Sequence, residues 1–144
     1  MINDGFNITG RLQIELNGEV VRDIDNLVTT AGKGFVAASM LKTTSNSPAA
    51  MTHMAIGSNT TNPAAADTAL GTELGRVTLT SAAVSGAVVT YIATFPAGTG
   101  TGAVVEAGIL NASSSGTLLC HTEFAVVNKG SADAITITWT VTVS

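Results

Sequence analysis

The chain is short of charge. Asp, Glu, Lys and Arg make up 11% of its 144 residues, against about 25% in an average soluble domain. A surface with so few charges must consist largely of Ser, Thr, Asn, Gly and Ala. Cytosolic enzymes normally use surface charge to stay apart from their neighbours. The composition therefore favours a protein that is covered by neighbouring molecules.

Cations and long apolar runs are also lacking. The six Lys and Arg residues form no cluster, and the formal net charge is −4. A nucleic-acid backbone is bound by several cations that displace its counterions, so we expect no nucleic-acid partner. No apolar run approaches the roughly 18 residues that a membrane span needs. We expect no membrane partner either.

Cysteine is nearly absent. Cys120 is the single cysteine, which excludes an intrachain disulfide. Residues 1–5 show neither the basic start nor the apolar core of a secretory leader. We therefore expect a chain made in the cytoplasm, with Cys120 as a buried structural thiol.

Motifs for phosphate and metal binding are missing as well. Residues 32–34 (GKG) lack the first glycine and the final hydroxyl residue of a phosphate-binding loop. The glycines of 98–102 lie between two predicted strands, not before a helix. His53 and His121 are far apart and have no companion at metal-ligand spacing. We predict no metal and no cofactor.

No catalytic constellation stands out. Cys120 and His121 are neighbours in a predicted strand, so their side chains point to opposite faces and cannot readily pair. Glu106 and Glu123 lie on predicted hairpin partners and could approach each other, but we expect both at isolated surface or edge positions. The sequence predicts no catalytic residues and no enzyme.

The strongest positive signal is the segment Ile135–Val143, which reads ITITWTVTV. Strict alternation of apolar residues with threonines is the pattern of a β-strand with one buried face. Trp139 lies on the apolar side and is expected in the core. Similar but weaker alternation predicts further strands at 11–16, 19–24, 51–57, 76–83, 88–95, 104–110 and 117–124.

One helix is expected near residues 30–42. Thr29 or Thr30 supplies a hydroxyl N-cap, and Lys42 falls in the last turn. Gly32 and Gly34 weaken the helix by roughly 1 kcal/mol each, which allows a late start, after Gly34. The whole pattern predicts one all-β domain over residues 1–144. We expect an eight-stranded antiparallel sandwich of two sheets, jelly-roll-like, with this one short helix; a β-barrel is the alternative.

Three segments resemble virion proteins of tailed bacteriophages. They are 26–41 (NLVTTAGKGFVAASML), 51–76 (MTHMAIGSNTTNPAAADTALGTELGR) and 93–144, which begins ATFPAGTGTGAVVEAGIL. A separate chain of this size is similar to the head cement or decoration proteins, some of which are jelly rolls on the capsid shell. The resemblance implies a non-enzymatic protein on the outer surface of the capsid, made in the host cytoplasm. It also implies two partners, the major capsid protein and further copies of this chain, as a dimer or trimer.

Two polar loops are the expected contact sites. The loop 58–70 contains a polar stretch, 58–67, without apolar periodicity, and loops of more than about 12–15 residues usually carry function or are disordered. We favour function. Backbone and hydroxyl groups of this loop and of 96–102 could reach a neighbour. The candidate interface residues are Asn59, Thr60, Thr61, Asn62, Thr99 and Thr101.

A tail-fibre or baseplate domain that binds a receptor or glycan is the alternative. Tyr91 and Trp139 would then be candidates for stacking on sugars, although Trp139 is expected in the core. Tail fibres carry a trimerising coiled coil, and the chain has no heptad repeat. The capsid hypothesis is therefore preferred.

Overall fold

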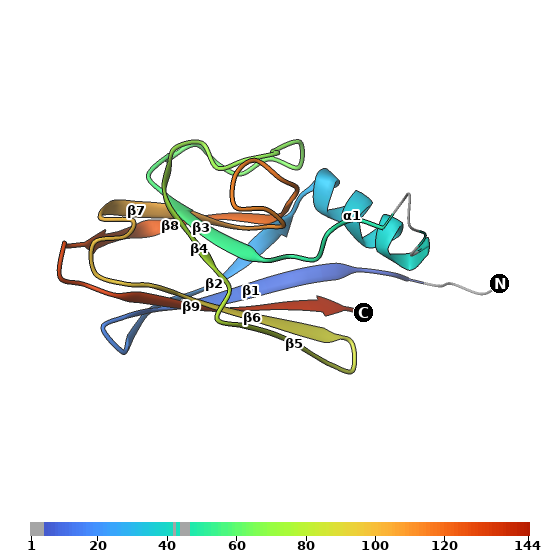
Figure 1. The fold of residues 1–144 in the computed structure, drawn as a ribbon, viewed down its shortest axis with the longest axis horizontal. Helices are drawn as coiled ribbons and strands as arrows, with labels where there is room; N and C mark the ends of the chain where they lie inside the picture. Colours follow the sequence, from blue (N-terminus) through green and yellow to red (C-terminus); the bar gives the residue numbers. More distant parts are fainter. Residues whose placement is uncertain (1–4, 42, 44–46) are drawn as a thin grey trace.

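The computed structural model describes residues 5–41, 43 and 47–144. Residues 1–4, examined above for a secretory leader, and Lys42, placed above in the last helical turn, lie outside these residues. The described strands are β1 (Ile8–Leu16), β2 (Glu19–Val28), β3 (His53–Gly57), β4 (Glu73–Thr78), β5 (Ser81–Ser85), β6 (Val88–Phe95), β7 (Gly102–Leu110), β8 (Leu118–Lys129) and β9 (Ile135–Val143). The helix α1 is Thr30–Leu41 (Figure 1).

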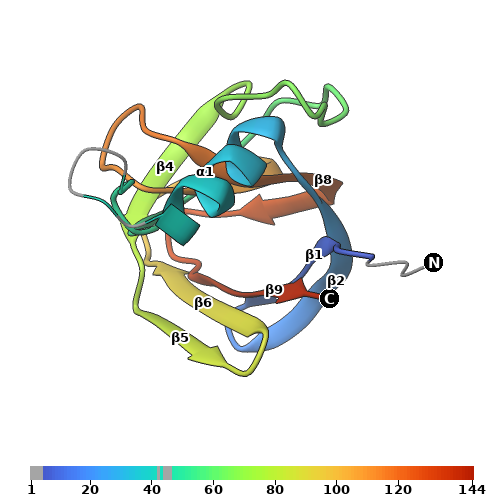
Figure 2. The same ribbon diagram turned by 90° about the vertical axis from the view of Figure 1, so that its right-hand side faces the viewer.

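The described strands form a single antiparallel sheet in the order β4-β3-β7-β8-β2-β1-β9-β6-β5. The sheet curls into a half-barrel, with α1 across one end (Figure 2). The mostly β, antiparallel fold with one short helix is thus confirmed. The predicted count of eight strands is wrong, because the described residues form nine. No helix in the described part of the chain combines the length and apolarity needed to cross a membrane.

The additional strand comes from the segment predicted as one strand, 76–83. In the structure β4 pairs with β3, whereas β5 pairs with β6 at the other end of the sheet. Between them the backbone N–H of Leu79 donates to Thr52 and that of Thr80 to Ile92. Val77 and Leu79 face the core before the crossing, whereas Ala82 and Val84 lie on the inner face after it. The alternation therefore shifts by one residue where the pairing partner changes, and the prediction of a single strand missed this shift.

Ile135–Val143 is β9, an inner strand of the sheet, as expected. It pairs with β1 on one side and β6 on the other, which places Trp139 between Leu12 and Tyr91. The Trp139 side chain is fully buried and its Nε1 donates to Asn26 Oδ1 at 2.9 Å. Apolar side chains from both halves of the sheet meet around it and form one core inside the curl.

Helix α1 does not start late, because Gly32 is needed at its beginning. The Thr29 hydroxyl is buried, accepts from the Gly32 N–H at 2.9 Å and donates to Leu118 O at 2.6 Å. A Cβ atom on Gly32 would lie 2.2 Å from Leu119 O. The glycine that lowers helix propensity therefore permits close packing on β8. Thr29 acts as the predicted N-cap.

Candidate functional site

The predicted contact loop 58–70 is part of the 58–72 loop between β3 and β4, which crosses the outer face of β3, β7 and β8 (Figure 1). Its Leu70 is buried and forms a small second core with Ala55, Leu110 and Leu118. Gly108 leaves the room for this packing, since a Cβ there would lie 2.6 Å from Leu70 Cδ1. The loop therefore covers one half of the sheet from outside.

Glu106 on β7 anchors both ends of this loop. Its Oε2 accepts the backbone N–H of Asn59 at 2.8 Å and of Thr72 at 3.0 Å, and its Oε1 accepts that of Gly71 at 2.9 Å. The side chain is buried, which contradicts the predicted surface position. A carboxylate can be buried here because three peptide groups and a histidine satisfy its oxygens.

His121 on β8 extends this network to the middle of the loop. Its Nε2 lies 3.0 Å from Glu106 Oε1, and its Nδ1 lies 2.8 Å from Asp67 Oδ2. Both ring nitrogens can donate when the imidazole is protonated, which would place one cation between two carboxylates. Asp67 also accepts the Ala64 N–H at 2.8 Å. That backbone hydrogen bond, with His121 as a smaller contribution, lowers the pKa of Asp67.

The loop is also tied to the helix. The backbone N–H of Thr30, the first residue of α1, donates to Ala65 O at 2.7 Å. Anchors thus lie at both ends of the loop and at its centre. Such anchoring reduces the entropy that the loop would lose when it binds a partner.

The exposed part of the loop carries no charge, because its acidic residue Asp67 turns toward His121. Thr60, Thr61 and Asn62 are exposed as predicted, whereas Asn59 is half-buried and its Oδ1 accepts the Thr61 N–H at 2.7 Å. A depression of about 170 Å³ lies beside these residues, with Glu106 and His121 at its base. The loop therefore presents an uncharged polar surface above the buried network.

The second predicted loop, 96–102, borders the same edge of the sheet. Thr99 is half-buried, and its Cγ2 lies 3.3 Å from the position of a Cβ on Gly75 in β4. Thr101 is exposed. The 58–72 loop leads directly into β4, so both predicted loops flank this strand.

His121 and Cys120 are not arranged as a base and its nucleophile, whereas His53 Nδ1 lies 2.8 Å from the Thr52 hydroxyl. His121 has both ring nitrogens bonded to carboxylates, which leaves neither to activate a hydroxyl or thiol. Cys120 is buried on the inner face as predicted, and burial raises its pKa to about 12. Across the described ranges, no three His, Cys, Asp or Glu side chains are grouped to hold a metal ion.

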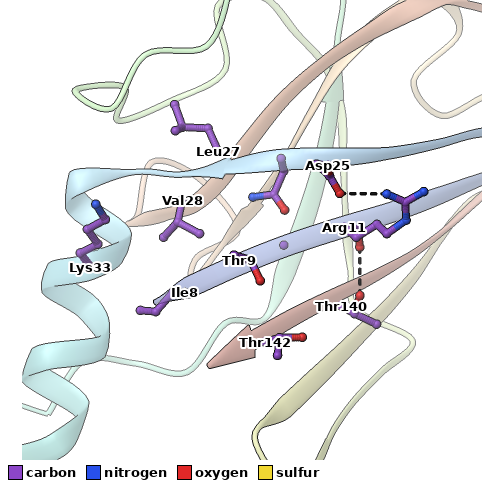
Figure 3. A pocket seen from close by; sticks show the side chains of 11 residues that line it. Ile8, Thr9, Arg11, Asp25, Leu27, Val28, Lys33, Thr140 and Thr142 are labelled. Carbon is purple, nitrogen blue, oxygen red and sulfur yellow. Dashed lines mark hydrogen bonds and ion pairs between the residues drawn. The ribbon is translucent and has the colours of Figure 1, made fainter. Parts of the chain in front are cut away.

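A hollow of about 570 Å³ lies where β2 leaves β1, next to α1 (Figure 3). Arg11 lies on one wall, but its guanidinium is paired with Asp23 at 2.8 Å and Asp25 at 2.9 Å. The Thr140 hydroxyl is also engaged, since it donates to the backbone oxygen of Arg11 at 3.2 Å. The Arg11 guanidinium and the Thr140 hydroxyl are therefore engaged within the chain, whereas Lys33 of α1 lines the same hollow.

No protein-family model matches the chain, and neither does any curated protein or solved structure in the comparisons.

Proposed function

We propose that the chain is a non-enzymatic capsid decoration protein. It binds the outer surface of a bacteriophage head and bridges neighbouring major capsid proteins. The observation that carries the proposal is the 58–72 loop, whose exposed residues are uncharged and whose backbone is anchored by Glu106 and Asp67. A rigid, polar, uncharged loop can bind through many backbone and hydroxyl hydrogen bonds without desolvating charge.

The fold of the chain is consistent with the same proposal. Apolar side chains from both halves of the single curled sheet share one core, which supports the proposal that the two halves correspond to the two sheets of a sandwich. We propose that it corresponds to the jelly-roll-like fold that the sequence resemblance implies. A shell offers many equivalent sites, so contacts that are weak singly would retain an oligomer of this chain strongly.

A receptor- or glycan-binding tail domain is favoured less. Tyr91 is 8% exposed and Trp139 is 0% exposed, so neither presents a ring face on which a sugar could stack. The surface of the isolated chain therefore lacks the two aromatics that motivated this alternative.

The decisive experiment counts copies of this chain in purified particles relative to the major capsid protein. A decoration protein is expected in a fixed ratio close to one, and electron cryomicroscopy should place it on the outer shell. A few copies at the tail would overturn the capsid proposal in favour of a tail domain. Absence from particles would overturn both.

The loop itself can be tested by adding a charge. Thr61→Lys should weaken binding to empty shells by about tenfold or more, since an unpaired charge would be buried in the contact. Ser131→Lys is the matched control, because Ser131 is exposed in the turn before β9. Equal binding of both variants would show that the 58–72 loop is not the contact surface.

A further inference from the structure

Strand β5 is an edge of the sheet without the usual protection. Every residue of Ser81–Ser85 is exposed, and among the described residues no strand pairs with its outer side. Proteins normally protect such edges with charged residues, proline or a bulge, because the free backbone N–H and C=O groups of an edge can hydrogen-bond to a strand of another molecule. The β5–β6 pairing shows no register shift. No charged residue stands between Arg76 and Glu106 in the sequence.

The free hydrogen-bonding groups of β5 can be assigned from its turn. Ser85 pairs with Val88 across Gly86 and Ala87, and Gly86 has a φ of 59°, which fits a two-residue hairpin turn with glycine first. In such a hairpin the residues that flank the turn bond to each other, and bonding alternates from there. Ser81 and Ala83 thus bond toward β6. Ala82 and Val84 direct their N–H and C=O groups outward.

The inner face beside this edge is apolar and incompletely covered. Ala82 and Val84 stand opposite Tyr91 and Val89, whose side chains face the core. Val84 is nevertheless 72% exposed. A groove of about 250 Å³ runs beside it, lined by apolar residues that include Phe35 and Met51. A strand added to β5 would cover this groove with alternate side chains.

We propose that a second copy of this chain adds to β5 by antiparallel pairing of β5 with itself, around a two-fold axis at Ala83. The sequence Ser-Ala-Ala-Val-Ser is nearly symmetric about Ala83. In this register Ser81 faces Ser85 of the second copy, and Ala82 faces Val84 of the second copy. Each small residue on the inner face therefore meets a larger one, and each Val84 lies beside the groove of its neighbour.

Charge near β5 does not oppose a second copy as the occupant. Two identical chains of net charge −4 repel each other, but the uncharged stretch between Arg76 and Glu106 keeps like charges of this segment out of the contact. A two-fold contact also closes on itself and does not propagate into a fibre. This pairing makes the oligomer of the proposed decoration protein a dimer. The pairing itself does not depend on the proposed function; only the position of the dimer on a capsid shell does.

Cysteine cross-linking tests both the pairing and its register. Ala83 should face itself in a non-hydrogen-bonded pair, where Cα atoms lie about 4.5 Å apart, within the range of a disulfide. Ala83→Cys should form a reducible dimer under mild oxidation. Ser81→Cys and Ser85→Cys should each form no intermolecular disulfide alone under the same conditions, yet should cross-link when the two variants are mixed. The native thiol of Cys120 is fully buried and should not interfere.

Sedimentation of the unmodified chain should give twice 14.4 kDa. Val84→Lys should weaken the dimer by about tenfold or more, because an edge charge opposes strand pairing. Val20→Lys is the control at a second exposed valine, and circular dichroism checks that both variants fold. A monomeric wild-type chain, or equal cross-linking of all three cysteine variants, would overturn the self-pairing. A monomer that still binds shells would leave the decoration function standing, whereas a dimer that binds no shell would overturn that function alone.

Discussion

The two halves of the curled sheet differ in what covers their outer faces. On β3, β7 and β8 the chain covers itself with the 58–72 loop, using Leu70 and a buried network centred on Glu106. On β1, β9 and β6 no segment among the described residues covers the outer face, which has the threonines of β9 along its middle. The covered half is held by specific internal bonds. The bare half remains available to other molecules.

The two edges of the sheet repeat this contrast. On β4, Arg76 bonds to the Glu73 carboxylate at 2.7 Å and to the backbone oxygens of Ala112 and Ser115 at 2.9 and 3.0 Å. Charge and a neighbouring loop thus protect that edge. On β5 neither is present in the described residues. The edge strand β4 is protected and the edge strand β5 is not. This difference is expected if β5 pairs with a strand of another molecule.

Trp139→Ala should have the largest effect, because Trp139 belongs to the core that joins both halves. Removing a buried tryptophan costs roughly 3–5 kcal/mol, and Asn26 would lose its indole donor. The domain should unfold as a whole, measured by urea denaturation. Trp139→Phe should retain most of the stability. A fully folded Trp139→Ala variant that loses only binding would mean that the apolar side of β9 is the contact face.

Glu106→Ala should destabilise only the covered half. It leaves the N–H groups of Asn59, Gly71 and Thr72 without their acceptor, which should cost about 3 kcal/mol. Limited proteolysis should then cut within 58–72 while hydrogen exchange in β9 stays slow. Glu123→Ala is the matched control, since Glu123 faces Glu106 across the β7–β8 pair but is only half-buried. Equal effects of the two variants would contradict the anchoring role of Glu106.

The bare half was easier to predict from sequence than the covered half. Alternation in Ile135–Val143 identified an inner strand and the place of Trp139, because a strand with one buried face shows itself in a period of two residues. Alternation alone could not show that residues 76–83 change partners, since pairing depends on distant strands. The change from β4 to β5 therefore required the structure.

The candidate site was predicted only in part. The sequence indicated the polar loop and its exposed residues, but not that Glu106 and His121 hold it, because these contacts join residues distant in the sequence. One signal was available. Glu106 interrupts the otherwise apolar stretch of β7, GAVVEAGIL, and a charged residue in such a stretch is usually buried with a partner.

Acid should loosen the covered half through Asp67. Its pKa is lowered in the folded chain, so its contribution to stability is present above the unfolded value near 3.8 and is lost as pH falls through the folded value. Proteolysis of 58–72 with pepsin should therefore accelerate below about pH 4. Asp67→Asn should show faster cutting already at higher pH and a smaller further change.

Asp133 provides the comparison in the other half. Hydrogen bonds from Asn17 and from the Gly130 N–H lower its pKa as well. Asp133→Asn should reduce the acid sensitivity of overall unfolding without altering the cutting of 58–72. If both aspartate variants changed loop cutting equally, acid would be acting on the whole fold and not on the loop.

The smallest change in stability should result from a substitution on the uncovered outer face of β9. Thr138 lies in the middle of β9 and points outward between Gln13 and Ile92. Thr138→Ala should alter the free energy of unfolding by no more than about 0.5 kcal/mol, as usual for surface positions. Leu70→Ala, on the outer side of the covered half, should cost about 2 kcal/mol, because it empties the second core. Chemical denaturation of both variants measures how much the side chains on each outer face contribute to the free energy of unfolding. Similar costs would mean that the threonine face is also packed within a single chain, which would remove it as a contact surface.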